Sequence, residues 1–294
     1  MLPDATPAST LIQHTDSESM RSGWQGRLDL SFERCESRTL LARRQHVGPL
    51  LVQKALYPEG PGTCHVAILH PPGGIAAGDD LGVQASLGGG ARALLTTPGA
   101  TKWYRSEGRQ ARQQCRFSLA EDSVLEWLPR ENILFDGSNL SMTLEVELSV
   151  NAKYFGWDIL SFGRRASGER WRRGSLQMDT RIRRAGRTLW LERADILAGS
   201  GFAQSPVGLA GFSVCGTFVV AGYDAESALL ARCRQVRSPR GSARVGITPV
   251  PGLLIARYLG DSVEESFGWF THLWTVLRPA LSGRSACVPR VWAC

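Results

Sequence analysis

The segment from Met142 to Val150 constrains the fold more than any other part of this chain. Its apolar residues alternate one by one with threonine, glutamate and serine, and a period of two predicts a strand with one buried face. Thirty-two glycines and 15 prolines supply many turns, which favours short strands over long helices. Further alternating or apolar runs predict strands at 27–33, 50–56, 63–69, 83–87, 91–97, 115–119, 124–128, 176–182, 188–191, 212–221 and 253–259.

Helices are few, and three are expected. They cover 154–162, 225–236 and 262–278, so the fold class is mainly β. Asp261 is placed to cap the last helix, with Glu264 three residues later as in a capping box, and Pro279 is expected to end it. The Gly88–Gly90 run predicts a hairpin that joins 83–87 to 91–97.

The composition sets the domain organisation and excludes some classes. No shift in composition divides residues 23–294, so we expect one domain. Residues 1–22 are rich in serine, threonine, aspartate and proline and lack the pattern of a secretory signal, which predicts a disordered tail. No run of 18 apolar residues exists, so we expect no membrane span. The seven widely spaced cysteines contain no Cys-x-x-Cys pair and indicate reduced thiols in a cytoplasmic protein.

Positive charge is concentrated in one segment. The whole chain has a net charge of +7, and residues 161–193 hold ten arginines and three acidic residues, which is 10 − 3 = +7. Such a cluster predicts an acidic partner, either protein or nucleic acid. Trp157 and Trp171, beside Arg164 and Arg165, favour a protein interface, because aromatic and arginine side chains dominate such surfaces.

The most distinctive loop runs from His70 to Leu81 and reads HPPGGIAAGDDL. Its prolines and glycines indicate a shaped loop that presents His70, Asp79 and Asp80. These side chains could be transient metal ligands, since imidazole suits nickel or zinc and carboxylates suit harder ions. Alternatively, the aspartates cap turns and His70 bonds to the loop backbone.

Two further dense segments follow at 95–106 and 125–137. The first contains TTPGATK, which lacks the phosphate-loop pattern and reads as a Pro-Gly turn. The second contains Glu126, Glu131 and Asp136. Glu126 stands in an apolar strand and needs a partner, for which Arg130 is a candidate. The acids could perform acid–base chemistry or form structural salt bridges.

Together these motifs carry a resemblance. HPPGGIAAGD, TTPGATKWYRS, LEWLPRENILFDG, Gly156-Trp157-Asp158, Gly163-Arg164 and the closing PRVWA resemble the urease accessory proteins of the UreD/UreH family. The resemblance implies a β-helix-like stack of many short strands with a few helices. It implies a scaffold on apo-urease and not an enzyme. Its implied partners are a helical accessory protein and, through it, a nickel-delivering GTPase, with no nucleic acid or membrane partner.

The resemblance also implies an internal nickel route and no stably held cofactor. The acids it assigns to that route are Asp79, Asp80, Glu131, Asp136 and Glu169, with His70 at the entrance. Ser161 stands where the family commonly has cysteine, so a thiol role is not expected there. The alternative function is a metal-dependent hydrolase that uses His70, Asp79 and Asp136, and a nucleic-acid-binding module is a third possibility.

Overall fold

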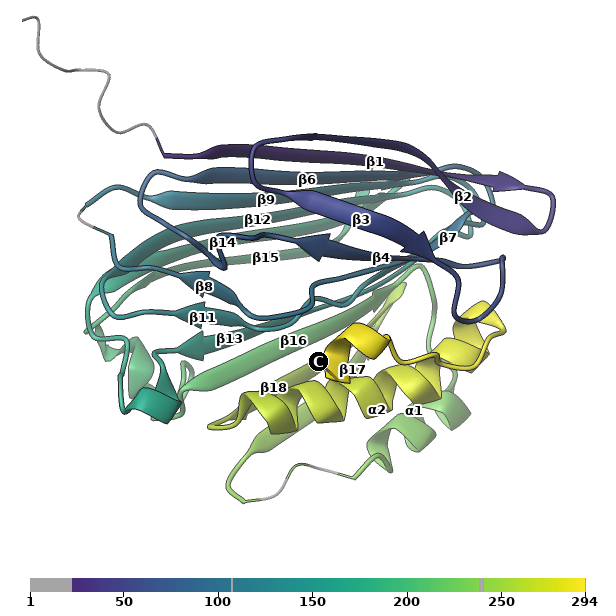
Figure 1. The fold of residues 1–294 in the computed structure, drawn as a ribbon. Coiled ribbons are helices and arrows are strands. Elements are labelled where there is room, and N and C mark those ends of the chain that lie inside the picture. Colours follow the sequence, from purple (N-terminus) through teal and green to yellow (C-terminus); the bar gives the residue numbers. More distant parts are fainter. Residues whose placement is uncertain (1–22, 107, 238, 240, 294) are drawn as a thin grey trace, which may run out of the picture.

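The computed structural model describes residues 23–106, 108–237, 239 and 241–293. The predicted tail at 1–22 lies outside the described residues. Two β-sheets are stacked face to face, and two α-helices cover the outer face of the second sheet (Figure 1). The expected mainly β fold with stacked strands is therefore confirmed.

The first sheet, which we call sheet A, has seven strands in the order β15-β14-β12-β9-β6-β1-β2. The five central strands are parallel, and the edge strands β15 and β2 are antiparallel to their neighbours. The alternating segment from Met142 lies in β12 as far as Leu148, where the strand ends, so its last two residues fall in the following turn. The bounds are β1 Gln25–Cys35, β2 Arg38–Val47, β6 Asp80–Leu87, β9 Ala111–Leu119, β12 Ser138–Leu148, β14 Gly174–Arg184 and β15 Arg187–Leu197.

The second sheet, sheet B, has the main order β17-β18-β16-β13-β10-β7-β4-β3, with three short strands beside it. Its central strands β4, β7, β10 and β13 are parallel. The bounds are β3 Leu51–Leu56, β4 Cys64–Leu69, β5 Gly74–Ile75, β7 Arg92–Thr96, β8 Thr101–Trp103, β10 Val124–Trp127, β11 Asn132–Leu134, β13 Lys153–Phe162, β16 Val214–Ala221, β17 Arg244–Val250 and β18 Leu253–Gly260.

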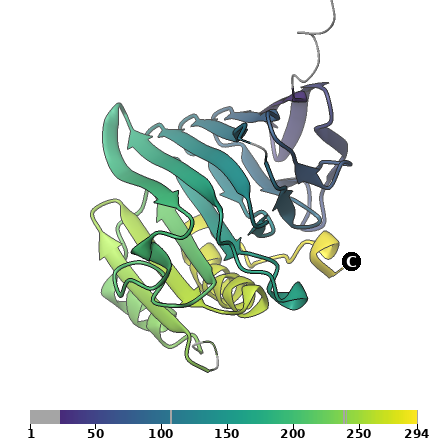
Figure 2. The ribbon, with the colours of Figure 1, turned by 90° about the vertical axis from the view of Figure 1, so that its left-hand side faces the viewer.

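The chain winds as a coil between the two sheets. Each turn runs from a strand of sheet B, through a short strand in three turns of the four, to a strand of sheet A: β4-β5-β6, β7-β8-β9, β10-β11-β12 and β13-β14. Figure 2 shows these turns side by side, from purple to green. Parallel neighbours require such crossovers, which gives the solenoid-like stack.

The predicted hairpin at Gly88–Gly90 is wrong. β6 pairs with β1 and β9 in sheet A, whereas β7 pairs with β4 and β10 in sheet B. The glycine run therefore turns the chain from one sheet to the other. Gly90 has a positive φ of 67°, which glycine adopts without strain.

The predicted helix at 154–162 is also wrong, because this segment is strand β13. One face of β13 packs in the core between the sheets, and the other packs under helix α2 (Val263–Ser282). A strand buried on both faces shows no simple alternation of apolar and polar residues, so its apolar run was mistaken for a helix.

The other two helices are confirmed with changed ends. Helix α1 is Ser227–Arg234. Helix α2 begins after Ser262, whose side chain accepts a hydrogen bond from the backbone N–H of Glu265 at 3.1 Å, so the cap is Ser262 and not Asp261. Pro279 lies inside α2, and the helix ends at Gly283 in the left-handed conformation. In the described part of the chain, no helix has the length and apolar character needed to span a membrane.

Three 3₁₀-helices complete the fold of the described residues. They are η1 (Arg165–Ser167), η2 (Gly201–Ala203) and η3 (Arg290–Ala293). Two apolar cores hold the layers together, one between the sheets and one between sheet B and the helices. Between the sheets, near β15, β16 and β18, side chains leave open space, and this space defines the candidate site.

Candidate functional site: a row of cavities between the sheets

The sequence motifs occupy equivalent corners of successive turns. Each corner follows a strand in the main order of sheet B and precedes a strand of sheet A. We number them along the chain: the first follows β4, the second β7, the third β10 and the fourth β13. Backbone hydrogen bonds join the corners in order: Thr101 N–H donates to Glu131 O at 2.9 Å, and Gly137 N–H donates to Arg173 O at 2.8 Å. The coil thus gathers motifs that lie about 30 residues apart.

The first corner holds His70, Asp79 and Asp80. Asp79 is buried, and its carboxylate accepts hydrogen bonds from the backbone N–H groups of Trp24 at 2.7 Å and Ala76 at 2.8 Å. Asp80 forms an ion pair with Arg27 at 3.1 Å. The turn-capping alternative therefore describes Asp79. His70 is half-buried, its Nε2 has no hydrogen-bond partner among the described residues, and desolvation lowers its pKa despite the charge of Asp79.

The third and fourth corners are tied together by acids. Asp136 accepts hydrogen bonds from the backbone N–H groups of Arg172 and Arg173, both at 2.8 Å, and forms an ion pair with the Arg173 guanidinium at 2.7 Å. Glu169 accepts from the backbone N–H of Asp136 at 2.9 Å and pairs with Arg164. The hydrogen bond from Arg164 keeps the pKa of Glu169 low. Burial raises the pKa of Asp136, but its donors outweigh that effect and lower it.

These contacts show that the acids predicted from the sequence do not gather at one site. The Oε2 atom of Glu131 lies 3.5 Å from Nε of Arg130, at ion-pair distance. This oxygen is buried and has no hydrogen-bond partner among the described residues. No group of three histidine, cysteine, aspartate or glutamate side chains suited to hold a metal ion occurs within the part of the chain that is described. Asp79 and Asp136, which the hydrolase hypothesis requires, instead bond to the backbone of their corners.

The four predicted interface residues divide into buried and exposed ones. Trp157 is only 2% exposed, donates to Pro129 O at 2.8 Å and packs against aromatic rings of α2, so the structure places it in the core and not on a surface. Arg164 and Arg165 are exposed at the fourth corner. Trp171 is half-buried beside Phe162, with ring centroids 5.5 Å apart.

Glu126 has a partner that the sequence did not indicate. It is buried in β10 and forms an ion pair with Arg278 of α2 at 2.9 Å, so the expected pairing with Arg130 is wrong. The guanidinium of Arg130 instead lies over the ring of Phe267, 4.2 Å from its centroid. Burial of a charge in an apolar strand required a partner, but only the tertiary fold brings Arg278 to it.

The space between the sheets forms a cavity of about 530 Å³, which we call the central cavity. Inward-facing residues of β13, β16 and β18 form its floor, and those of β14 and β15 form its roof. Val207, which is 96% exposed, lies at its rim. The polar and sulfur-bearing side chains that line it are Tyr154, Asp158, Met178, Thr180, Glu192, Cys215, Thr217, Arg244, Arg257 and Tyr258.

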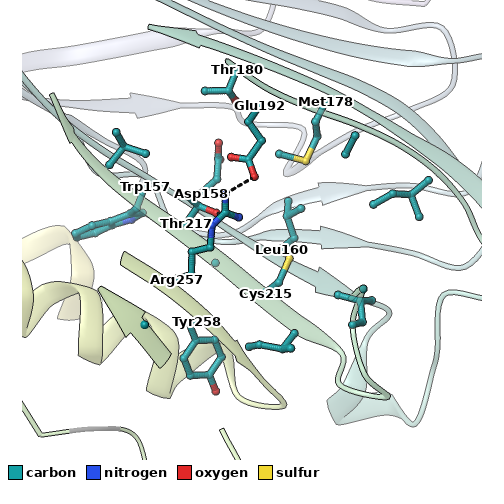
Figure 3. A pocket seen from close by; sticks show the side chains of 18 of the residues that line it. Trp157, Asp158, Leu160, Met178, Thr180, Glu192, Cys215, Thr217, Arg257 and Tyr258 are labelled. Carbon is teal, nitrogen blue, oxygen red and sulfur yellow. Dashed lines mark hydrogen bonds and ion pairs between the residues drawn. The ribbon is translucent and has the colours of Figure 1, made fainter. Parts of the chain in front are cut away.

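Two facing rows of residues place the charges in this cavity. In sheet B, Asp158, Thr217 and Arg257 are direct neighbours across β13, β16 and β18. In sheet A, Thr180 and Glu192 are neighbours across β14 and β15. Arg257 reaches across the gap and binds Glu192 with an Nη2–Oε1 distance of 2.7 Å (Figure 3).

Asp158 is the acid that this environment perturbs most clearly. Burial first, and then the charge of Glu192, raise its pKa from 3.8 to about 7. Its Oδ1 lies 3.5 Å from Asn132 Nδ2, a weak contact that satisfies little of the carboxylate. This carboxyl therefore keeps its proton to a much higher pH than an ordinary aspartate does.

Two smaller cavities continue from the central cavity. The first, of about 40 Å³, shares Leu144, Asp158, Met178 and Thr180 with it. The second, of about 180 Å³, shares Thr97, Thr101, Gln113 and Trp127 with the first and includes His70. The three spaces thus form a row between the sheets, from Val207 at one end to His70 at the other.

Sequence reasoning missed Asp158, Glu192 and Arg257 as site residues, although one signal was present. In β15 the inward face carries Trp190, Glu192, Ala194 and Ile196, so a single charge stands on an apolar face. A half-buried charge on an apolar face needs a functional or structural reason. Asp158 belonged to a recognised motif but was assigned to a helix, which hid the direction of its side chain.

The raised pKa of Asp158 predicts how stability depends on pH. The stabilisation of the folded state by the neutral carboxyl is complete below its ordinary pKa of 3.8. It is lost as the pH rises through the raised pKa of about 7. We expect Asp158→Asn to gain stability over the wild type by an amount that grows by about 2 kcal/mol between pH 5 and pH 8. Urea unfolding at both pH values measures this. A difference independent of pH would show that Asp158 ionises normally.

The fold and the cavities define a solenoid-like β protein with a row of cavities between its two sheets. Comparison with known proteins then identifies its family. Residues 25–293 match the family described as UreD urease accessory protein, so the chain belongs to that family and is an accessory protein of urease.

Relatives named Urease accessory protein UreD support this over nearly the whole length. That from Azoarcus sp. (strain BH72) is 50% identical over 270 residues, covering 92% of this chain and 94% of the relative. That from Dechloromonas aromatica (strain RCB) is 47% identical, with coverage of 92% and 94%. That from Nitrosococcus oceani is 45% identical over 289 residues, with coverage of 98% and 94%.

Proposed function

We propose that this protein is a chaperone of urease maturation, a scaffold that passes nickel ions to apo-urease along the row of cavities. The observation that carries the proposal is the pair of facing acids, Asp158 and Glu192, inside a cavity that continues toward His70. Carboxylates attract a divalent cation, and an imidazole suits nickel. Because the acids and His70 are spread along the row, a nickel ion would pass from one to the next and would not be retained by several at once. Nickel is therefore cargo here and not a resident cofactor.

The route proposed here differs in part from the one that the family resemblance implied. Asp136 and Glu169 accept hydrogen bonds that shape the corners, so we assign them to the scaffold of the route. His70 keeps its place as a lining residue at the far end of the row. Asp79, Asp80 and Glu131 remain candidates at that end, near the corner segments.

The exposed fourth corner is the proposed partner surface. Arg164, Arg165, Arg170, Arg172 and Arg173 are exposed there, around the half-buried Trp171. Such a surface suits an acidic protein partner, and we propose apo-urease or the helical accessory protein, with the nickel-delivering GTPase joined through the latter. We place this non-catalytic role in the cytoplasm, where the six free cysteines of the described residues stay reduced.

The route is tested by removing its charges. The double variant Asp158→Asn/Glu192→Gln is co-expressed with the cognate urease subunits and accessory proteins, and urease is then activated with nickel and bicarbonate. We expect activity and urease nickel content to fall about tenfold or more, since an entering cation loses both carboxylates that could attract it. Co-purification with urease should be unchanged, because both side chains lie inside the cavity.

The matched control carries the same chemical changes on the outer face of sheet A. Asp179 and Glu145 pair there with Arg193 and Arg116, away from the cavity. We expect Asp179→Asn/Glu145→Gln to activate urease as the wild type does. Equal activation by the two double variants would refute the route. If urease is activated although this protein forms no complex with it, the scaffold role is refuted. Tests for a bound metal and for hydrolase activity would then follow.

A further inference from the structure

The central cavity contains a positive charge where a cation is proposed to pass. Arg257 extends from β18 across the gap and forms the 2.7 Å ion pair with Glu192 of β15. Its Nη1 also lies 3.3 Å from the Thr217 hydroxyl, and its guanidinium lies 5.8 Å from the centre of the Trp190 ring. A fixed cation repels a passing one, so its presence on this route needs an explanation.

Arg257 contacts one acid of the route, Glu192, directly, and it lies in the same cross-strand row as the other, Asp158, with Thr217 between them. Asp158, Thr217 and Arg257 form one row on the inner face of sheet B, and Glu192 faces that row from sheet A. Arg244 also lines the cavity, but its guanidinium lies over Phe212, 5.7 Å from the ring centre. Arg257 is therefore the cation that is placed to compete with nickel for Glu192.

We infer that Arg257 is the internal counterion that keeps Asp158 and Glu192 from retaining nickel. The ligands of the row as a whole are separated, but Asp158 and Glu192 line the same cavity, and without a cation beside them they would bind a divalent ion more tightly and slow its transfer. With Arg257 present, nickel must displace the guanidinium from Glu192, and the returning guanidinium then displaces nickel. The side chain has room for this exchange because it is 50% exposed, while Glu192 is 25% exposed.

This inference deepens the proposed function and rests on it, and it predicts a gain of binding. In Arg257→Gln the acids lose their counterion, so we expect the full-length chain to bind nickel about tenfold more tightly than the wild type in equilibrium dialysis. Urease activation should fall at the same time, because nickel stays in the cavity. Arg257→Lys keeps the positive charge and should restore both values toward the wild type.

The controls separate this effect from a general change of charge. Arg193→Gln removes the same charge from the outer face of β15, where Arg193 pairs with Asp179 at 2.8 Å, and should leave nickel affinity unchanged. Arg257→Gln/Glu192→Gln should lose the tight binding. Arg257→Met keeps the apolar stem beside Trp190 and gives a second test if the glutamine variant does not fold.

The outcomes distinguish the two proposals. If both charge-removing variants at Arg257 fold and bind nickel no more tightly than the wild type, the counterion role is refuted. That result, with activation still lost in Asp158→Asn/Glu192→Gln, would leave the nickel route intact. Normal activation in that double variant would refute the route itself, whatever the affinity of the Arg257 variants.

Discussion

Replacing Arg278 by methionine is expected to lower the free energy of unfolding by about 3–5 kcal/mol, the cost of leaving a buried carboxylate without its partner. The Arg278 side chain is 1% exposed in α2. Its guanidinium binds Glu126 of β10 with Nε–O distances of 3.0 Å, and Glu59 at 2.7 and 2.9 Å. Urea unfolding at neutral pH measures the loss.

The neighbours of Arg278 explain why this loss should be large. Trp274 donates to Glu126 at 2.5 Å, and His65 lies 2.6 Å from Glu59, so one network ties α2 to sheet B and to the loop before β4. Burial raises the pKa of Glu59, but hydrogen bonds from His65 and Arg278 outweigh it and lower the pKa to about 2. Glu59 is therefore ionised at neutral pH and needs its cation.

Two further variants test this explanation. Glu126→Gln/Arg278→Met leaves no unpaired charge on Glu126, so it should lose less stability than Arg278→Met alone. Arg116→Met breaks the exposed pair with Glu145 and should change stability by no more than about 0.5 kcal/mol. If the double variant were as unstable as the single one, the stranded charge of Glu126 would not be the cause, and lost packing together with the unpaired Glu59 would account for the loss.

Replacing Trp157 by alanine is expected to cost about 3–5 kcal/mol, the usual range for removing a large buried aromatic side chain. Its ring packs edge-on against Phe218 and Phe267, with centroids 5.5 and 5.6 Å away, and stacks on Phe270 at 6.2 Å. It also contacts Trp292 near the C-terminus at 5.8 Å. Because this ring joins β13 to α2, thermal and urea unfolding should both report the loss.

Trp171→Ala is the matched control, since Trp171 is half-buried at the exposed fourth corner. We expect it to cost less stability than Trp157→Ala and to weaken co-purification with urease or the accessory partners more. Under conditions where both variants are folded, Trp157→Ala should co-purify normally. Loss of partner binding by folded Trp157→Ala alone would restore the interface role that its burial argues against.

The cavity residues show where prediction from the sequence failed. Asp158 lies on the β13 face that carries Tyr154, Leu160 and Phe162, opposite the face of Trp157. A helix at 154–162, as predicted from the sequence, would point these side chains in other directions than strand β13 does. Arg257 and Glu192 are 65 residues apart in the sequence, and no local pattern indicates that they meet.

The corner motifs show where it succeeded. Their glycines, prolines and acids indicated shaped loops with capped backbone groups, and Asp79 and Asp136 do accept backbone hydrogen bonds. This part was accessible because turn chemistry depends on a few adjacent residues. The assignment of Asp79 to a metal route came from family resemblance. The backbone contacts of Asp79 do not test that role, which stays a prediction.

Local sequence patterns were enough to predict the local elements: the alternating strand β12, the capped helix α2 and the turns between short strands. These depend on side-chain period and backbone preference within a few residues. Strand pairing depends on the tertiary structure, because β6 and β7 have the pattern of a hairpin yet join different sheets. It also decided the site, since Asp158, Glu192 and Arg257 meet only when the coil stacks one sheet on the other.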